Sequence, residues 1–320
     1  MGPTEAPGRP AVEIRRASEM GFCMGVRRAV QIMREEAGAS GPVFSIGEIV
    51  HNPRVVEELA ADGVIQLPGP DDIDTNIGTA TVEAIGSGRV AITAHGVGEK
   101  AVAELGTAGL DIVDTTCPIV TRAQRYAQKM VREGWHVLIL GDPGHKEVRG
   151  ILGWTGDAAG DSHATVVRES GLEELREVVG RFPDGFPNKV GVMAQTTHKI
   201  EEFSRFVSNL MLLQRDHNFE LHVVNTLCHA TTGQQEAAAA LAREVDVMII
   251  VGGRKSANTR HLKEVSEEQG TTAHHIEGPG ELRRAWFAGV RSVGLTAGAS
   301  TPDSSIDEIE DRIRSLTTTP

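Results

Sequence analysis

The chain contains three cysteines, and each lies where a predicted strand gives way to a predicted helix. Their contexts are G-F-C-M-G-V at Cys23, D-T-T-C-P at Cys117 and N-T-L-C-H-A at Cys228. Any one of them alone is simply explained as an inert buried thiol, since free cysteine is among the most buried residue types. Three thiols at equivalent positions indicate ligands, either of zinc with an open fourth position or of a [4Fe–4S] cluster with one iron lacking a protein ligand. Because the sequence has no close C-x-x-C pair, it favours the cluster.

Polar residues recur at two further positions of the same repeat. Those 28 positions after the cysteines are His51, His145 and Ser256, and those 72 positions after the first and third are His95 and Ser300. In the middle copy the matching place is predicted at Thr196, after a short insertion near residues 184–188. Helix capping would explain Ser256 or Ser300 equally well. Neutral donors and two histidines beside helix N-termini also suit a diphosphate.

Glu147, in the run H-K-E that begins at His145, is the single carboxylate predicted at this level of the pocket. An acid near the start of a helix is ordinarily a solvated first-turn residue. A carboxyl group among histidines and hydroxyls could instead donate a proton, because burial can tune its pKa toward neutrality. Thr196, in the run Q-T-T, could pass that proton on.

A threefold internal repeat of one strand–helix unit must position these residues. Eight short apolar runs are predicted to be buried parallel strands, at 43–46, 90–93, 112–113, 137–140, 190–193, 221–224, 247–251 and 292–296. Ligands bind at the carboxyl ends of strands in open α/β sheets, so each copy is expected to offer one thiolate and two polar residues to a shared pocket. The predicted fold class is α/β, with three similar units of mostly parallel sheets around a central pseudo-threefold site.

The repeat also sets the expected domain boundaries. Residues 1–13 are predicted to be a disordered tail, because they are polar and rich in proline and glycine. The first domain is expected at 14–116, completed by a helix at 301–316. The second is expected at 117–226 and the third at 227–300.

The composition excludes several classes of protein. The 320 residues carry a formal charge of −12, whereas a nucleic acid or an anionic membrane surface would call for a basic face. No apolar run approaches the roughly 20 residues of a membrane-spanning helix, and the start has no apolar signal core. Three widely spaced cysteines fit a reducing compartment better than a disulfide framework. A soluble, cytoplasmic protein is therefore expected.

Nine motifs occur in the order seen in the LytB/IspH family of 4-hydroxy-3-methylbut-2-enyl diphosphate reductases, which the chain resembles from about residue 14 to 316. They are G-F-C-M-G-V-R-R-A, H-N-P-x-V-V, A-H-G-V, T-C-P-x-V-T, G-H-K-E-V-x-G, Q-T-T, C-H-A-T-T-x-x-Q-E-A, S-A-N-T and T-A-G-A-S-T-P-D. The resemblance implies a trefoil of three α/β units around one [4Fe–4S] cluster. It also implies reductive removal of the hydroxyl of (E)-4-hydroxy-3-methylbut-2-enyl diphosphate. The products would be isopentenyl and dimethylallyl diphosphate, from the last step of the non-mevalonate isoprenoid pathway.

Position by position, the resemblance implies a role for each of these residues. The roles are cluster ligation by Cys23, Cys117 and Cys228, diphosphate binding by His51, His95, Ser256, Asn258 and Ser300, substrate contact by His145, proton donation by Glu147, and a hold on the substrate hydroxyl by Thr196. Many family members have a second serine where this chain has Ala257. A backbone N–H of Ala257 could still serve the substrate there.

No G-x-G-x-x-G follows a predicted strand, so the sequence shows no flavin or nicotinamide fingerprint. A separate low-potential carrier, ferredoxin or reduced flavodoxin, is therefore the expected electron donor. Two rival hypotheses remain: an iron–sulfur sensor that binds diphosphate without turnover, and a zinc hydrolase built on the three thiolates. A binding-only site would not need Glu147 and Thr196 together, and a brown colour that is lost in air would exclude zinc.

Overall fold

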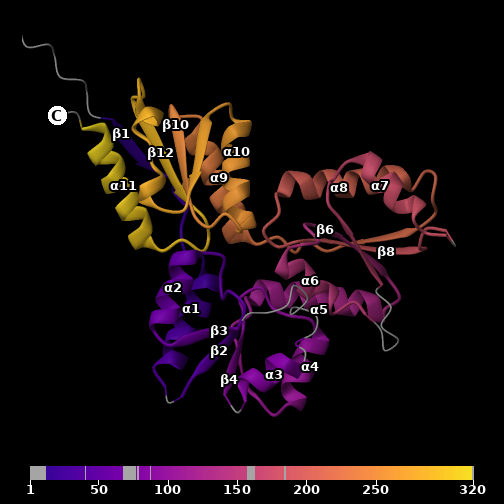
Figure 1. Ribbon diagram of the computed structural model, residues 1–320. Coiled ribbons are helices and arrows are strands. Elements are labelled where there is room, and N and C mark those ends of the chain that lie inside the picture. Colours follow the sequence, from indigo (N-terminus) through magenta and orange to yellow (C-terminus); the bar gives the residue numbers. More distant parts are fainter. Residues whose placement is uncertain are drawn as a thin grey trace, which may run out of the picture. The chain divides into compact units, whose positions relative to one another are not determined.

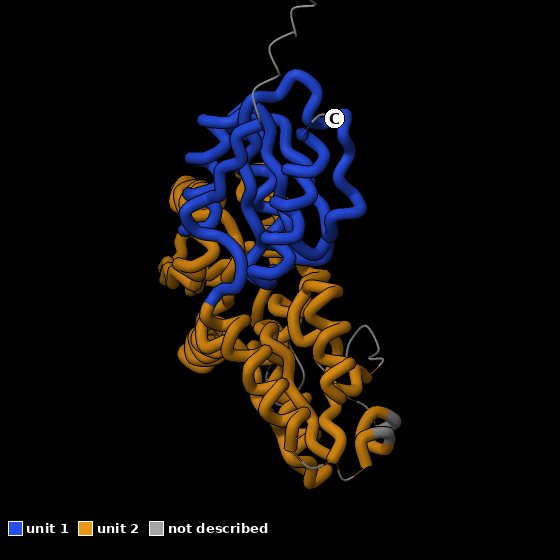
Figure 2. The backbone as a smooth tube through the Cα atoms, turned by 90° about the vertical axis from the view of Figure 1, so that its left-hand side faces the viewer, with its two compact units in different colours: residues 1–23, 233–320 blue, residues 24–232 orange. Residues whose placement is uncertain are grey.

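The computed structural model describes residues 12–39, 41–67, 77, 79–86, 88–156, 163–183 and 185–318. Figure 1 shows the α/β character of the chain, in which twelve strands alternate with eleven α-helices among the described residues. The strands form three separate four-stranded parallel sheets. The chain divides into two compact units, residues 1–23 with 233–320 and residues 24–232 (Figure 2).

The first compact unit contains one sheet. Its strands, in spatial order, are β1 (Glu13–Arg16), β12 (Ser292–Ala297), β10 (Val247–Val251) and β11 (Thr272–Ile276). Successive residues of β10 face opposite sides, the two-residue period of a buried strand. Ile249 packs against α11 (Asp303–Thr317), and Ile250 packs against α9 (His229–Ala242) and α10 (Ala257–Glu268). The short 3-10 helices η1 (Pro279–Glu281) and η2 (Arg284–Phe287) connect β11 to β12.

Two segments belong to a different α/β unit from the one expected, namely the unit that contains β10 and β12. Residues 14–16 and the helix at 301–316 were expected to belong to the first domain. Instead β1 pairs with β12, with Ile14 opposite Val293. The apolar stripe of α11, which includes Ile309, is buried in the same cluster as β10 and β12. The physical reason is that this sheet offers both an unpaired strand edge and the apolar face that α11 needs to cover.

The second compact unit contains the other two sheets. The strand order of one sheet is β3 (Val64–Leu67), β2 (Val43–Ile46), β4 (Arg89–Ile92) and β5 (Asp111–Asp114). The strand order of the other is β7 (Ala164–Val167), β6 (His136–Leu140), β8 (Lys189–Ala194) and β9 (Glu220–Val223). Their helices are α1 (Met24–Ala37), α2 (Pro53–Ala61), α3 (Thr79–Ile85), α4 (Glu99–Thr107), α5 (Pro118–Arg132), α6 (Lys146–Leu152), α7 (Leu172–Gly180) and α8 (Ile200–Leu213). All three sheets share one strand order, in which β1 takes the place that β5 and β9 take. This common order confirms three similar α/β units.

All eight predicted strands are present, and four more were missed. The missed strands are β1, β3, β7 and β11, and each lies at the edge of its sheet. An edge strand is buried less than a central one, so it needs no continuous apolar run. β1 illustrates this with the sequence E-I-R-R, in which no residue is fully buried. No helix in the described part of the chain is long and apolar enough to cross a membrane.

Candidate active site

Each cysteine occupies the same place in the repeat, in the loop after an edge strand and directly before a helix. Cys23 lies between β1 and α1, Cys117 lies after β5 at the N-cap position of α5, and Cys228 lies between β9 and α9. All three side chains are half-buried and none is in a disulfide. The main-chain N–H of each donates to a carbonyl on the loop after the neighbouring strand: Cys23 to Ala299 at 3.0 Å, Cys117 to Ala94 at 3.0 Å and Cys228 to Thr196 at 2.8 Å.

The loops before Cys117 and Cys228 are held by the same side-chain hydrogen bonds. Two residues before each cysteine, a threonine hydroxyl donates to a strand carbonyl: Thr115 to Ile92 and Thr226 to Ala194, both at 2.5 Å. Three residues before each, an acceptor side chain closes a tight turn: Asp114 accepts from the N–H of Thr116 at 2.9 Å and Asn225 from that of Leu227 at 3.0 Å. The motifs D-T-T-C and N-T-L-C carry this signal in the sequence. The loops hold both cysteines at equivalent backbone positions.

These carbonyl partners correct the predicted register of the repeat. Thr196 occupies the place of Ala94 and Ala299, so Thr197 is the structural counterpart of His95 and Ser300. The prediction had matched Thr196 itself to that position. The insertion invoked for the middle copy includes residue 184, which lies outside the described residues.

Three histidines meet in the second compact unit. The rings of His51 and His95 stack with centroids 4.1 Å apart, and the ring of His145 meets both edge-on at 5.5 and 5.7 Å. They come from the loops after β2, β4 and β6, so two different sheets contribute to the cluster. The structure thus brings the three predicted histidines together, and their role in binding substrate stays a prediction.

His95 is the member of the cluster that is poor at holding a positive charge. Burial, reinforced by His51, His145 and Lys146, holds the pKa of His95 well below its usual range, so that ring is neutral. Its buried Nδ1 atom has no hydrogen-bond partner among the residues that the structure describes. An orphaned buried polar atom is uncommon in a folded protein, and one at a functional site is explained when a ligand completes it.

Glu147 is buried, with 2% of its surface exposed. Its Oε1 accepts a hydrogen bond from the main-chain N–H of Thr196 at 2.6 Å, and its Oε2 accepts one from the Thr196 hydroxyl at 2.9 Å. Desolvation raises the pKa of Glu147 to about 7, although both bonds from Thr196 act to lower it. Near neutral pH this carboxyl group is therefore present in both protonation states, which is incompatible with a solvated first-turn acid.

His145 begins the helix that carries Glu147. The His145 Nδ1 accepts from the main-chain N–H of Glu147 at 3.2 Å, which caps α6 and keeps a proton off that nitrogen. The proton of the neutral ring is then on Nε2. The local sequence therefore fixes both the tautomer of one candidate ligand contact and the position of the candidate acid.

The remaining predicted substrate contacts lie in the first compact unit. The Ser256 Oγ accepts from the N–H of Thr259 at 3.3 Å, so the expected cap of α10 is present. The Asn258 Nδ2 donates to Gln234 at 2.8 Å, and the amide of Gln234 donates to the carbonyl of Gly21 at 2.8 Å. The buried Oδ1 of Asn258 has no hydrogen-bond partner in the described part of the chain. Ala257 and Ser300 are buried.

The two compact units divide the predicted site between them. The second holds Cys117 and Cys228 with the histidines, Glu147 and Thr196, and the first holds Cys23 with the Ser256 loop. Among the described residues, no group of three histidine, cysteine or acidic side chains is arranged to hold a metal ion. Convergence of the three thiols stays a prediction.

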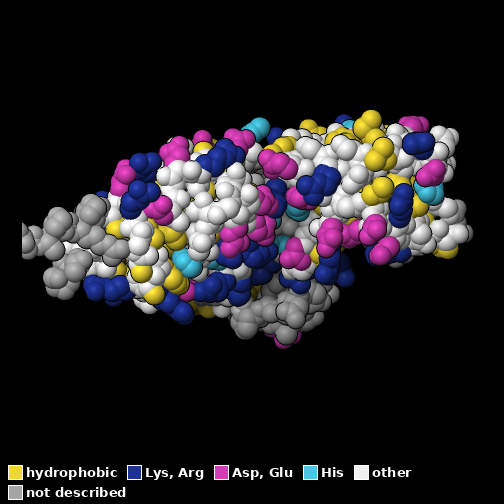
Figure 3. Space-filling model, turned by 90° about the horizontal axis from the view of Figure 1, so that it is seen from above, with side chains coloured by type: hydrophobic (Ala, Val, Ile, Leu, Met, Phe, Trp, Pro, Cys, Tyr) yellow, Lys and Arg dark blue, Asp and Glu magenta, His cyan; other side chains and the backbone are white. Residues whose placement is uncertain are grey.

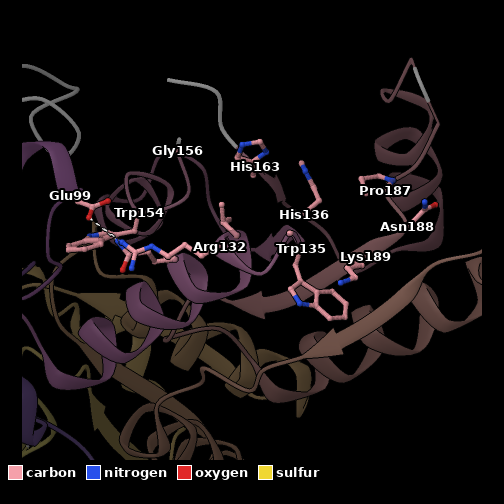
Figure 4. Close-up of a pocket in the computed structure, with 13 residues that line it drawn as sticks. Glu99, Arg132, Trp135, His136, Trp154, Gly156, His163, Pro187, Asn188 and Lys189 are labelled. Atoms are coloured by element: carbon pink, nitrogen blue, oxygen red, sulfur yellow. Dashed lines mark hydrogen bonds and ion pairs between the residues drawn. The ribbon is translucent and has the colours of Figure 1, made fainter. Parts of the chain in front are cut away.

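A cavity of about 810 Å³ lies away from all of these residues. Figure 4 shows it at the amino ends of β6 and β8, where His136 and Lys189 begin the two strands. The Lys189 ammonium lies 5.5 Å from the centre of the Trp135 ring. Ligand sites in open α/β sheets lie at the opposite, carboxyl ends of the strands, so this cavity is not assigned to the chemistry.

Comparison with known proteins identifies the family. The LytB protein family model matches residues 14–314. Proteins called 4-hydroxy-3-methylbut-2-enyl diphosphate reductase are similar to the chain. One from Pelobacter propionicus is 42% identical, and the match covers 93% of this chain and 96% of the relative. One from Geobacter sulfurreducens is 41% identical, and the match covers 95% of this chain and 97% of the relative. A solved structure of (E)-4-hydroxy-3-methyl-but-2-enyl diphosphate reductase, described as the terminal enzyme of the non-mevalonate pathway, matches with a TM-score of 0.63 at 36% identity, covering 95% of this chain and 99% of that one. A Plasmodium falciparum structure, with a TM-score of 0.80 but 24% identity over 97% and 90%, supports the fold alone. The chain belongs to the LytB family.

Proposed function

We propose that this protein is a 4-hydroxy-3-methylbut-2-enyl diphosphate reductase that carries out the last step of the non-mevalonate isoprenoid pathway. The overall reaction adds two electrons and two protons to the allylic alcohol and yields water plus isopentenyl or dimethylallyl diphosphate. The observation that carries the proposal is the buried Glu147 carboxyl, with a pKa near 7, held by Thr196 in the compact unit that also contains the histidine cluster. The relatives named for this activity support the choice of substrate.

The three cysteines fit a [4Fe–4S] cluster. Each is a half-buried thiol at one equivalent backbone position, and thiolates are the usual ligands of such clusters. We propose that Cys23, Cys117 and Cys228 hold the cluster in a trefoil arrangement of the three units. When bound, the cluster supplies electrons to the substrate one at a time.

The protein's own part in the reaction begins with binding. We propose that the diphosphate is held by His51, His95 and the residues Ser256, Asn258 and Ser300, with the Ala257 backbone beside them. A neutral His95 can donate one hydrogen bond without the cost of burying a cation. We propose that the His145 Nε2–H donates to the substrate, because its Nδ1 already accepts from the main-chain N–H of Glu147.

The hydroxyl leaves only if it is protonated, because hydroxide is a poor leaving group. We propose that Thr196 holds this hydroxyl and that Glu147 gives it a proton, so that water departs. After donation, the carboxylate keeps both hydrogen bonds from Thr196, which favour its charged form. Burial favours the protonated form of Glu147, whereas the hydrogen bonds from Thr196 favour its carboxylate form. This balance brings the pKa of Glu147 to about 7.

The electrons must come from outside the chain. We propose that ferredoxin or reduced flavodoxin supplies them, and that the enzyme works in the cytoplasm, where a reducing environment preserves free thiols.

Product analysis tests this function. Protein purified without oxygen is expected to be brown and, with a strong one-electron reductant, to convert the allylic diphosphate into the two isoprenoid diphosphates. Binding of the substrate without any product would favour the iron–sulfur sensor. Colourless protein containing zinc would favour the hydrolase.

A further inference from the structure

A second, smaller pocket of about 480 Å³ lies between α1 and α5 of the second compact unit. Four of its side chains are cationic and one is a carboxylate: Arg28, Arg122, Arg125 and Lys129, with Asp114. We call these four cations and Tyr126, which also lines the pocket, the basic pocket. It stands out because the whole chain carries a formal charge of −12 and because acidic and basic side chains are interspersed over the face shown in Figure 3.

The positive charge of the basic pocket is largely uncompensated. Arg122 and Arg125 are exposed, and neither forms an ion pair within the described ranges of the chain. Among the described residues, the Arg28 guanidinium donates only to main-chain carbonyls, those of Thr116 at 3.2 Å and Asp114 at 3.4 Å. Within the same part of the chain, Lys129 has one loose, exposed contact, with Glu133 at 3.8 Å. Such a patch attracts an anionic partner over a Debye length of about 8–10 Å.

The basic pocket is adjacent to a predicted cluster ligand. Thr116 and Pro118, the two chain neighbours of Cys117, both line it. Through its two carbonyl contacts, Arg28 links α1 to the backbone immediately before Cys117. A partner seated on these residues would therefore contact the backbone on both sides of Cys117.

Exposed apolar surface accompanies the charge. Tyr126, the single tyrosine of the chain, is 39% exposed within the basic pocket. Met24 is 77% exposed one helical turn before Arg28, so both lie on the same face of α1. Aromatic, methionine and arginine side chains are enriched in protein–protein interfaces. The cationic groups are exposed rather than enclosed, which suits a transient protein partner better than a small anion needing a desolvated cage.

From these observations we infer that the basic pocket is the docking surface for an acidic one-electron carrier protein. The inference rests on the proposed function, which requires a donor and does not say where it binds. In each encounter the reduced carrier would give up one electron and be oxidised, and a cluster held by Cys117 and the other two cysteines would accept that electron. Two reduced carriers, with two protons, complete one turnover.

Charge reversal tests the surface, with an acidic [2Fe–2S] ferredoxin as the carrier. We expect Arg122→Glu/Arg125→Glu to lower the ferredoxin-supported kcat/KM by roughly 10-fold or more, since steering of this kind contributes about 10 to 10³-fold to association. Most of the loss should appear in KM, and the decline of the wild-type rate with added salt should flatten in the variant. Affinity for oxidised ferredoxin, measured by calorimetry, should fall by a similar factor.

The matched control is Arg176→Glu/Arg215→Glu, which changes the net charge equally at two exposed residues outside the basic pocket. Both double variants should keep near-wild-type activity with a small chemical reductant such as dithionite.

Equal loss of ferredoxin activity in both would overturn the inference, because net charge alone would then explain it. The inference would also be overturned if the pocket variant bound ferredoxin as tightly as the wild type does. It would be overturned as well if these arginines bound free diphosphate more tightly than ferredoxin. If the wild type makes no product even with dithionite, the proposed function fails instead. If the pocket variant is misfolded by circular dichroism, the milder Arg122→Gln/Arg125→Gln gives the same test.

Discussion

Thr196 donates two hydrogen bonds to Glu147, one from its main-chain N–H to Oε1 and one from its hydroxyl to Oε2. The two residues are 49 positions apart in the sequence: Glu147 lies in the first turn of α6, which follows β6, and Thr196 lies in the loop after β8. The pairing places a buried acid and a hydroxyl side by side at the carboxyl edge of one sheet. Because each bond stabilises the carboxylate, Thr196 limits how far burial can raise the pKa.

Glu147→Gln should separate catalysis from binding. Glutamine keeps the size of the side chain and an oxygen that can accept from the Thr196 N–H, but it has no carboxylic proton to give. We expect cluster content and substrate affinity to stay nearly intact while turnover falls by roughly 10²-fold or more. Steady-state rates, iron analysis and calorimetric substrate binding measure the three quantities. A Gln variant with wild-type turnover would remove Glu147 from the mechanism.

The raised pKa of Glu147 also makes a prediction about stability. The folded protein binds this proton below about pH 7, whereas the unfolded chain binds it only below about 4.5. The favourable contribution is therefore fully present below about 4.5 and is lost as the pH rises through about 7. Relative to Glu147→Gln, the wild type should lose about 3 kcal/mol of unfolding free energy across that window. Parallel thermal or denaturant unfolding of the two proteins at several pH values measures the difference, and a pH-independent difference would contradict the burial argument.

Thr196→Val should change the pKa of Glu147 without replacing Glu147 itself. Valine removes the hydroxyl donor but keeps the main-chain N–H, so one of the two bonds that favour the carboxylate is lost. We expect the pKa of Glu147 to rise further and the alkaline limb of the activity profile to move to higher pH. Turnover should fall by roughly 10-fold, as expected for the loss of one hydrogen bond of about 1–1.5 kcal/mol to the reacting hydroxyl. Thr196→Ser should restore both properties, and a pH profile unchanged in the Val variant would show that the hydroxyl has no electrostatic role.

Much of the fold was predictable because its signals are local. Central strands such as β10 are continuous apolar runs, and the repeat spacing was set by the cysteines. The pairing of β1 with β12 was not predictable, because it joins residues almost 280 positions apart. The strands are held together by backbone hydrogen bonds, which do not depend on the identity of the side chains.

The candidate site was predictable for a related reason. Its residues are the chemically distinctive ones at strand ends, such as His51 and His95, and parallel sheets gather strand ends at one edge. The one-residue shift at Thr196 was missed because an insertion moves the sequence spacing without moving the backbone contact to Cys228. The hydrogen bond that the Asn258 amide donates to Gln234 was missed, because side-chain amide pairs leave no periodic pattern in the sequence.

Replacement of the cysteines tests the cofactor assignment. Cys23→Ser, Cys117→Ser and Cys228→Ser should each cause loss of the brown colour and of bound iron, because the three positions are equivalent in the repeat. Iron and sulfide analysis of anaerobically purified protein measures this. A variant that retains full iron content would exclude that cysteine as a ligand.

Ser256 has two assigned roles, and one set of substitutions separates them. Its Oγ caps α10 by accepting from the Thr259 N–H, and we propose that the same hydroxyl donates to the diphosphate. Ser256→Ala should lose about 1 kcal/mol of stability from the cap and also weaken substrate binding by roughly 1–3 kcal/mol, while the colour persists. Ser256→Asp keeps a good N-cap acceptor, so stability should return, but its negative charge faces the bound anion and binding should be lost.

Asn258→Ala is the companion variant for Ser256. It removes the partner of Gln234 without affecting the cap of α10, and it should weaken substrate binding by a similar roughly 1–3 kcal/mol. Calorimetric titration with the substrate, alongside thermal unfolding, gives both quantities for each variant. If Ser256→Asp binds substrate as tightly as the wild type, Ser256 is only a cap. If stability and affinity fall together in Asn258→Ala, the amide pair supports the loop and does not itself hold the diphosphate.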